Sequence, residues 1–231
     1  MKILVTIGGG ELREGDTYEI DREIVRLSST QNGVRKYALF LPTASHDSKP
    51  YFNTFRKMYT SRLGCKVDVA LITTGEMDVE HIRAKISKAD IIYVGGGDTA
   101  YMMEQFDRYG MVDMLTEAYE RGCVICGLSA GAICWYEHMQ SDVDKMRQGP
   151  DAPYVVLDGY GWVEGICYPH FDDESRRRGY EQIRCDYSTN IAIESNSAVV
   201  YIDGELRGSL SSGGRSYLNG EIIPPLDIER E

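Results

Sequence analysis

Residues 123–132, CVICGLSAGA, hold a serine in a context that suits a nucleophile. The apolar run before Gly127 predicts a buried strand, and the small residues after Ser129 predict a helix. A serine on a sharp strand-to-helix turn projects its hydroxyl above the sheet edge, beside the first free N–H groups of the helix. Gly127 and Gly131 suit such a turn, because its backbone is strained and neighbouring chain must pass close to it. Since G-x-S-x-G also occurs in ordinary turns, the function of Ser129 depends on its partners.

A serine nucleophile needs a general base, and the chain has four histidines. We expect His170 to be this base, because the run from Cys167 to Asp172 is short, apolar and punctuated by proline, which would fix the imidazole at the end of a strand. His46 is the second choice, because its loop also follows a predicted strand.

A carboxylate must orient the base and stabilise its cation. We favour Glu194, because it ends the apolar run Asn190–Ile193, where an unpaired charge would be costly. Asp144 and Asp142, in the polar segment after the predicted Ser129 helix, are the alternatives.

A second glycine-rich loop follows another predicted strand at Gly95–Asp98. If that strand neighbours the Ser129 strand, the N–H of Gly97 can act with the N–H of Ala130 as the pair of oxyanion donors. Neither G-x-G-x-x-G nor a P-loop lysine accompanies these glycines, so nucleotide binding is not expected. Downstream of His170, Arg176 follows a run of acids on a predicted helix and could turn inward to bind a substrate carboxylate.

Apolar strands alternating with amphipathic helices position these residues. This alternation predicts βαβ units, a mostly parallel sheet flanked by helices, and functional groups beyond the carboxyl ends of its strands. Strands are expected at 2–7, 37–41, 65–72, 89–94 and 123–128, and helices at 16–28, 52–63, 79–87, 100–109 and 111–121.

The last third of the chain is richer in strand. After the Ser129 helix, with His138 near its end, residues 136–149 turn polar and 148–153 are the least regular. Hairpin-like runs follow at 191–194, 198–202, 205–210 and 215–223, and Asp203-Gly204 is a strong hairpin turn. We therefore expect an antiparallel C-terminal extension of the parallel sheet.

Composition limits the remaining choices. The 231 residues favour one α/β domain over residues 1–231, and a net charge of −11 argues against a broad basic face for nucleic acid. Six cysteines, mostly in apolar segments, indicate reduced core thiols and a cytoplasmic protein. The first apolar run is too short for a signal peptide, and no segment has the length of a transmembrane helix.

Four motifs together resemble one family. Gly95–Asp98, Gly127–Ala132, Pro169–Asp172 with Glu174–Arg176, and Ala192–Glu194 are similar in order and spacing to the peptidase E and cyanophycinase family of serine peptidases, S51. The resemblance spans most of the chain. The order serine, histidine, carboxylate differs from the serine, acid, histidine order of α/β-hydrolases.

The resemblance implies a class I glutamine amidotransferase-like fold and hydrolysis of amide bonds next to aspartate. It implies Ser129 as nucleophile, His170 as base, and Gly97 with Ala130 as oxyanion donors. For the third member it offers Glu194 and Asp144. Arg176 matches the arginine of the peptidase E pattern Glu-Thr-Arg, and Asp98 takes the place of the asparagine that follows the glycines in peptidase E, so both are assigned to substrate binding.

The expected activity is that of a serine peptidase acting on aspartyl dipeptides or short peptides, as a monomer or homodimer, with no metal or organic cofactor. Two alternatives remain at this point. One is a non-catalytic protein that uses the pocket to bind an acidic ligand or a partner, and the other is an esterase or amidotransferase-like hydrolase.

Overall fold

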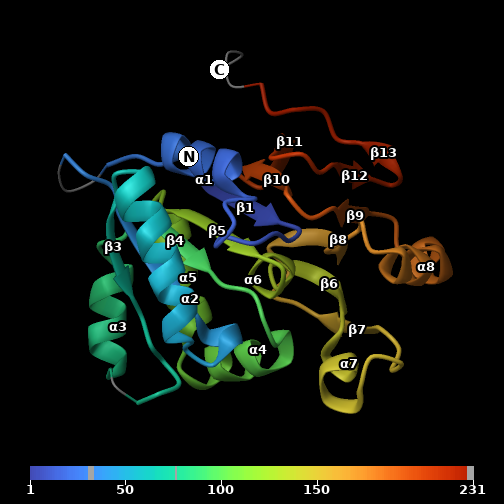
Figure 1. Cartoon of the computed structure of the whole chain (residues 1–231), viewed down its shortest axis with the longest axis horizontal. Coiled ribbons are helices and arrows are strands. Elements are labelled where there is room, and N and C mark those ends of the chain that lie inside the picture. The colour runs from blue at the N-terminus through green and yellow to red at the C-terminus, as the bar shows by residue number, and fades with distance from the viewer. Residues whose placement is uncertain (31–33, 76, 228–231) are drawn as a thin grey trace.

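The larger of two sheets contains five parallel strands and two antiparallel ones (Figure 1). It belongs to a computed structural model that describes residues 1–30, 34–75 and 77–227. Strand β10 pairs antiparallel with β1, and β11 with β10, which gives the expected antiparallel extension. In sheet order the strands are β11 (Glu205–Ser211), β10 (Ser197–Ile202), β1 (Ile3–Ile7), β5 (Val124–Leu128), β4 (Ile91–Val94), β2 (Tyr37–Leu41) and β3 (Lys66–Val69).

Helices cover both faces of this sheet, which explains why its central strands are apolar without alternation. One buried cluster joins one face to α1, α2 and the π-helical turn η2, and another joins the other face to α3, α4 and α5. These elements are α1 (Tyr18–Leu27), η1 (Thr43–Ser45), α2 (Lys49–Lys57), η2 (Met58–Arg62), α3 (Val79–Ile86), α4 (Thr99–Arg108) and α5 (Met111–Glu120). The α/β architecture expected from the alternating pattern is confirmed.

A second, six-stranded sheet lies beside the first and was not expected from the sequence (Figure 1). Its order is β13 (Glu221–Ile222), β12 (Ser216–Leu218), β9 (Asn190–Ile193), β8 (Val163–Tyr168), β6 (Tyr136–Ser141) and β7 (Val155–Asp158). The helical elements of this half of the chain are α6 (Ala130–Ile133), α7 (Val143–Gln148), α8 (Glu174–Ile183) and η3 (Arg184–Asp186).

Two local predictions were wrong. The helix after Ser129 ends at Ile133, so His138 lies on strand β6 rather than near a helix end. Strand β6 was missed because its sequence is polar. It forms because β7 and β8 pair with it on either side. The runs at 191–194 and 198–202 belong to different sheets, and the chain crosses between them at Asn196, which has φ 61°.

Two further expectations concern the cysteines and the membrane. All six cysteines are free, and five are buried, with Cys185 exposed. Among the described residues, none of the helices combines the length and the apolar character that crossing a membrane takes.

Candidate active site

Ser129 stands at the turn between β5 and α6 in a strained conformation, with φ 52° and ψ −111°. Its N–H donates to the carbonyl oxygen of Ile7 at 2.9 Å, which ties the turn to β1. A Cβ added at Gly127 would lie 2.1 Å from the carbonyl oxygen of Gly131, and one added at Gly131 would lie 2.2 Å from that of Val94. The two glycines therefore allow the close backbone approach that this turn requires.

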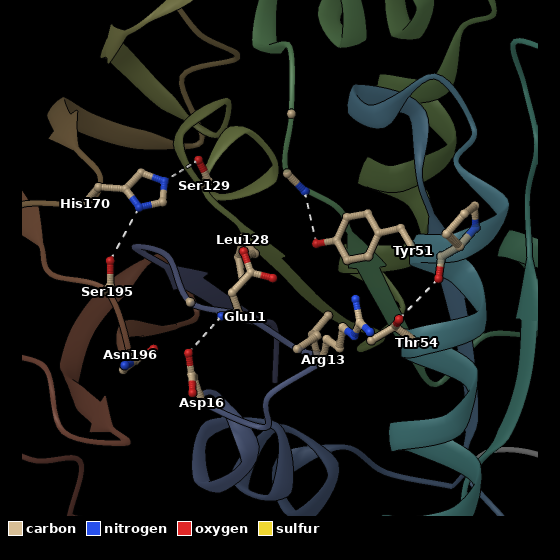
Figure 2. A pocket seen from close by; sticks show the side chains of 15 residues that line it. Glu11, Arg13, Asp16, Tyr51, Thr54, Leu128, Ser129, His170, Ser195 and Asn196 are labelled. Carbon is tan, nitrogen blue, oxygen red and sulfur yellow. Dashed lines mark hydrogen bonds between the residues drawn. The ribbon is translucent and has the colours of Figure 1, made fainter.

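His170 follows β8 and reaches the serine across the junction of the two sheets. Its Nε2 lies 2.8 Å from Oγ of Ser129, the contact that the sequence motifs led us to expect (Figure 2). The backbone of His170 also has a positive φ, 49°. A Cβ at Gly9 would lie 2.3 Å from Nδ1 of the ring, so glycine there leaves room for the imidazole.

Three consecutive carbonyl groups at the end of β1 hold the parts of the site together. Those of Ile7, Gly8 and Gly9 accept the N–H groups of Ser129, His170 and Asn196 at 2.9, 3.1 and 2.9 Å. The loop after β1 is therefore the shared anchor for the nucleophile, the imidazole and the crossing at 194–196.

The other ring nitrogen of His170 faces a hydroxyl group. Oγ of Ser195 lies 3.4 Å from Nδ1, and the N–H of Ser195 donates to Oδ1 of Asp172 at 2.6 Å. Burial raises the pKa of Asp172, but hydrogen bonds from the backbone and hydroxyl of Ser195 outweigh it, so the pKa lies below its usual value. Ser195 could not be singled out from the sequence, because an uncharged serine in a loop carries no distinctive signal.

The predicted carboxylate partners lie elsewhere. Glu194 accepts hydrogen bonds from the hydroxyl of Tyr217 at 2.8 Å and the N–H of Arg215 at 3.0 Å, and it pairs with Arg177. Among the described residues, no carboxylate is hydrogen-bonded to His170. The assignment of Glu194 to this position fails because adjacent side chains diverge: Glu194 points toward β12, and its neighbour Ser195 points toward the imidazole.

Asp144 and Asp142, the alternative partners, lie on and just before α7. Asp144 is in the first turn of that helix, and Asp142 accepts from Nη2 of Arg176 at 2.9 Å. Arg176 does turn inward and is buried, as expected, but its carboxylate partner is Asp142 of this chain. Its Nη1 also donates to the carbonyl of Gln140 at 2.9 Å, and its guanidinium lies 4.4 Å from the ring centroid of Tyr154.

The glycine-rich loop lies where the neighbouring-strand argument placed it, because β4 pairs with β5. A Cβ at Gly97, which has φ 142°, would lie 2.2 Å from the carbonyl oxygen of Ala44, so only glycine fits. In the described part of the chain, the N–H groups of Gly97 and Ala130 have no acceptor and remain available. Asp98 instead caps α4, accepting from the N–H of Tyr101 at 2.9 Å.

A cavity of about 670 Å³ opens over Ser129 and His170 (Figure 2). Its wall includes residues that the sequence reasoning missed, although the Gly8–Gly10 run beyond the central strand β1 was a signal for them. Neither Asp98 nor Arg176 lines it. The lining residues are Gly10, Glu11, Leu12, Arg13, Asp16, Pro50, Tyr51, Thr54, Gly96, Gly97, Leu128, Ser129, His170, Ser195 and Asn196.

Burial lowers the pKa of His170 below 6.5, and the positive charge of Arg176 adds to this shift. The carboxylates of Asp142, Asp172 and Asp173 oppose it. The lowered pKa favours the neutral imidazole, which is the form that can accept a proton.

We expect NMR titration of His170 to give a midpoint below pH 6.5, with its resonances assigned by comparison with His170→Gln. Asp172→Asn is expected to lower the midpoint further, because it removes a charge that stabilises the imidazolium. A midpoint above 6.5 in the unmodified protein, or a rise in Asp172→Asn, would contradict this account.

Comparison with known proteins finds relatives along almost the whole chain. The profile of peptidase family S51 matches residues 4–208. The uncharacterized peptidase YgaJ of Bacillus subtilis (strain 168) is 30% identical over 223 residues, covering 94% of this chain and 91% of that protein. The uncharacterized peptidase Lin0382 of Listeria innocua is 26% identical and covers 77% of this chain and 86% of its own length.

Two solved structures share the fold. A peptidase from an acI-B1 Actinobacterium superposes with a TM-score of 0.72 at 19% identity, covering 98% of this chain and 96% of that one. A candidate peptidase E protein from Listeria monocytogenes EGD-e superposes with a TM-score of 0.67 at 21% identity. The match covers 91% of this chain and 98% of that one. This likeness agrees with a class I glutamine amidotransferase-like fold.

Proposed function

The chain belongs to peptidase family S51, and from this membership and the geometry of the cavity we propose that it is a serine peptidase that cleaves amide bonds next to aspartyl residues. One observation carries the serine-type proposal. Oγ of Ser129, on a strained strand-to-helix turn, lies 2.8 Å from Nε2 of His170 inside a cavity. A nucleophile and a base at hydrogen-bonding distance are the minimum for acyl transfer.

In the proposed reaction, His170 takes the proton of Ser129 as Oγ attacks the amide carbonyl. The developing oxyanion accepts hydrogen bonds from the N–H groups of Gly97 and Ala130, which have no acceptor in the described residues. His170 then protonates the leaving amine, which departs and leaves an acyl group on Ser129. Finally His170 activates water to hydrolyse that ester.

Ser195 and Asp172 are proposed to orient the base in place of a directly bound carboxylate. With the proton of the neutral imidazole on Nδ1, that N–H faces Oγ of Ser195, and the Ser195 hydroxyl is free to donate to Asp172. Nε2 is then left as the acceptor for the Ser129 proton, which is the tautomer that a general base needs.

The aspartyl specificity in this proposal is supported by the motif resemblance to peptidase E. A small peptide substrate suits a cavity of about 670 Å³, which is within the usual range for small-molecule sites. A cytoplasmic location is part of the same proposal, and the free cysteines, most of them buried, are compatible with it.

The test treats the purified protein with a fluorophosphonate probe and, separately, with α-aspartyl and β-aspartyl dipeptides, a carboxylic ester and glutamine. We expect the probe to label Ser129, located by peptide mass spectrometry, and at least one aspartyl dipeptide to be hydrolysed faster than its asparaginyl counterpart. Labelling with hydrolysis of the ester alone would indicate an esterase. Ligand binding without labelling or hydrolysis would indicate a non-catalytic binding protein.

A further inference from the structure

The loop after β1 brings charges of both signs into the cavity. Glu11, Arg13 and Asp16 line it together, and Arg13 is the positively charged side chain among its described lining residues (Figure 2). In Figure 2, Arg13 and Thr54 lie on the side of the cavity away from His170, and Glu11 lies between. The loop is closed on itself, because the carbonyl of Glu11 accepts three N–H groups, from residues 14 to 16, at 3.1 to 3.2 Å.

The guanidinium of Arg13, unlike that of Arg176, has no hydrogen-bond or ion-pair partner among the described residues. Within the described part of the chain, no carboxylate, carbonyl or aromatic ring is paired with its guanidinium. Asp16 forms no ion pair with Arg13 among the described residues, and Oδ2 of Asp16 accepts the N–H of Glu11 at 3.4 Å instead. Arg13 is exposed to solvent on the cavity wall, and its unpaired guanidinium offers a fork of N–H donors that matches a carboxylate.

Acceptors for a positively charged group lie in the same cavity. The side chain of Glu11 has no hydrogen-bond partner among the described residues, and together with burial and the charge of Asp21 it contributes to raising the pKa of Tyr51 to about 12. Oδ1 of Asn196, another lining residue, is buried and also lacks a donor in the described part of the chain. A buried acceptor without a donor is costly unless water or a ligand supplies one.

We propose that Arg13 binds a carboxylate of the dipeptide substrate and that Glu11, together with Asn196, binds its α-ammonium group. The inference deepens the proposed peptidase function and rests on it. Opposite charges on one loop match a zwitterion better than they match an internal stretch of polypeptide. The carboxylate is either the aspartyl side chain or the C-terminal group, and the substrates below distinguish the two.

The test measures equilibrium binding by calorimetry in Ser129→Ala, so that recognition is read without turnover. The ligands are Asp-Leu, Asn-Leu, Asp-Leu amide and N-acetyl-Asp-Leu. Adding Arg13→Gln is expected to weaken binding of Asp-Leu by about 10- to 100-fold, the range of a charge-assisted pair. If Arg13 binds the aspartyl side chain, Arg13→Gln should not weaken binding of Asn-Leu, which lacks that carboxylate. If Arg13 binds the C-terminal carboxylate, the substitution should not weaken binding of Asp-Leu amide.

Adding Glu11→Gln is expected to weaken binding of Asp-Leu by about 10-fold and to leave N-acetyl-Asp-Leu unaffected. Arg56→Gln is the matched control, because Arg56 is an exposed arginine of α2 outside the cavity lining. The proposal is overturned if Ser129→Ala binds none of the ligands, or if Arg13→Gln weakens all four equally or none. Binding as expected, with no fluorophosphonate labelling of the unmodified protein, would instead reject the catalytic proposal alone.

Discussion

Ser129→Ala is expected to lower kcat for an aspartyl dipeptide by about 10⁴- to 10⁶-fold, the range found when a serine nucleophile is removed. The reason is that the attacking oxygen is lost and no neighbouring group replaces it at 2.8 Å from Nε2 of His170. Binding contacts of the cavity stay in place, so KM should change far less than kcat.

The fold should survive this change, because alanine keeps the Cβ of serine at the same strained φ of 52°. Thermal unfolding followed by circular dichroism checks this directly. Ser87→Ala is the control, since Ser87 is an exposed residue whose hydroxyl, within the described ranges, bonds only the carbonyl of Ala84. Turnover by Ser129→Ala within 10-fold of the unmodified protein would remove the proposed nucleophile.

Gly127→Ala is expected to lower the free energy of unfolding by about 3 kcal/mol, at the upper end of the overpacking range. The new Cβ would lie 2.1 Å from the carbonyl oxygen of Gly131 and 3.0 Å from that of Val94. Both neighbours are backbone atoms of the sheet and the turn, so neither can move aside as a side chain would. For a chain of this length the loss corresponds to a fall in Tm of roughly 6 to 12 °C.

Chemical denaturation measures this loss, with Gly179→Ala as the matched control. A Cβ at Gly179 would meet side chains rather than backbone: the amide end of Gln140 at 2.4 Å and, in ordinary contact, the ring of Tyr154 at 3.7 Å. Gly179 also lies inside α8, where alanine is the better helix former. We expect the control to stay within about 1 kcal/mol of the unmodified protein. Equal effects of the two substitutions would show that the turn at Ser129 tolerates a side chain.

Much of the first sheet and the meeting of Ser129 with His170 could be predicted from sequence, and for one reason. Strands such as Ile3–Ile7 and Val124–Leu128 are buried on both faces, so their apolar runs are continuous and easily recognised. Once they are recognised as parallel, the loops at their carboxyl ends must share one edge. The glycines around Ser129 then indicate where backbone approaches backbone.

The second sheet and the partner of the imidazole could not be predicted, because both depend on tertiary contacts. Strand β6 has the polar sequence Tyr136–Ser141 and is a strand because β7 and β8 pair with it. Glu194 and Ser195 are adjacent, yet Glu194 contacts Tyr217 and Ser195 contacts the imidazole of His170. The residue pattern of 190–196 does not indicate which of the two faces the imidazole. Arg13 is an exposed loop residue, and the sequence does not show that its loop lines the cavity.

Because Ser129 and His170 follow strands of different sheets, the proposed catalytic site forms only after both sheets have folded and packed together. Ser129 follows β5 of the first sheet, and His170 follows β8 of the second, 41 residues later. A nascent chain in which only the five parallel strands of the first sheet have formed would display the Ser129 hydroxyl without an imidazole beside it. Hydrolytic activity would therefore arise only when the two sheets pack against each other, so measured activity would report the fraction of molecules that have completed folding.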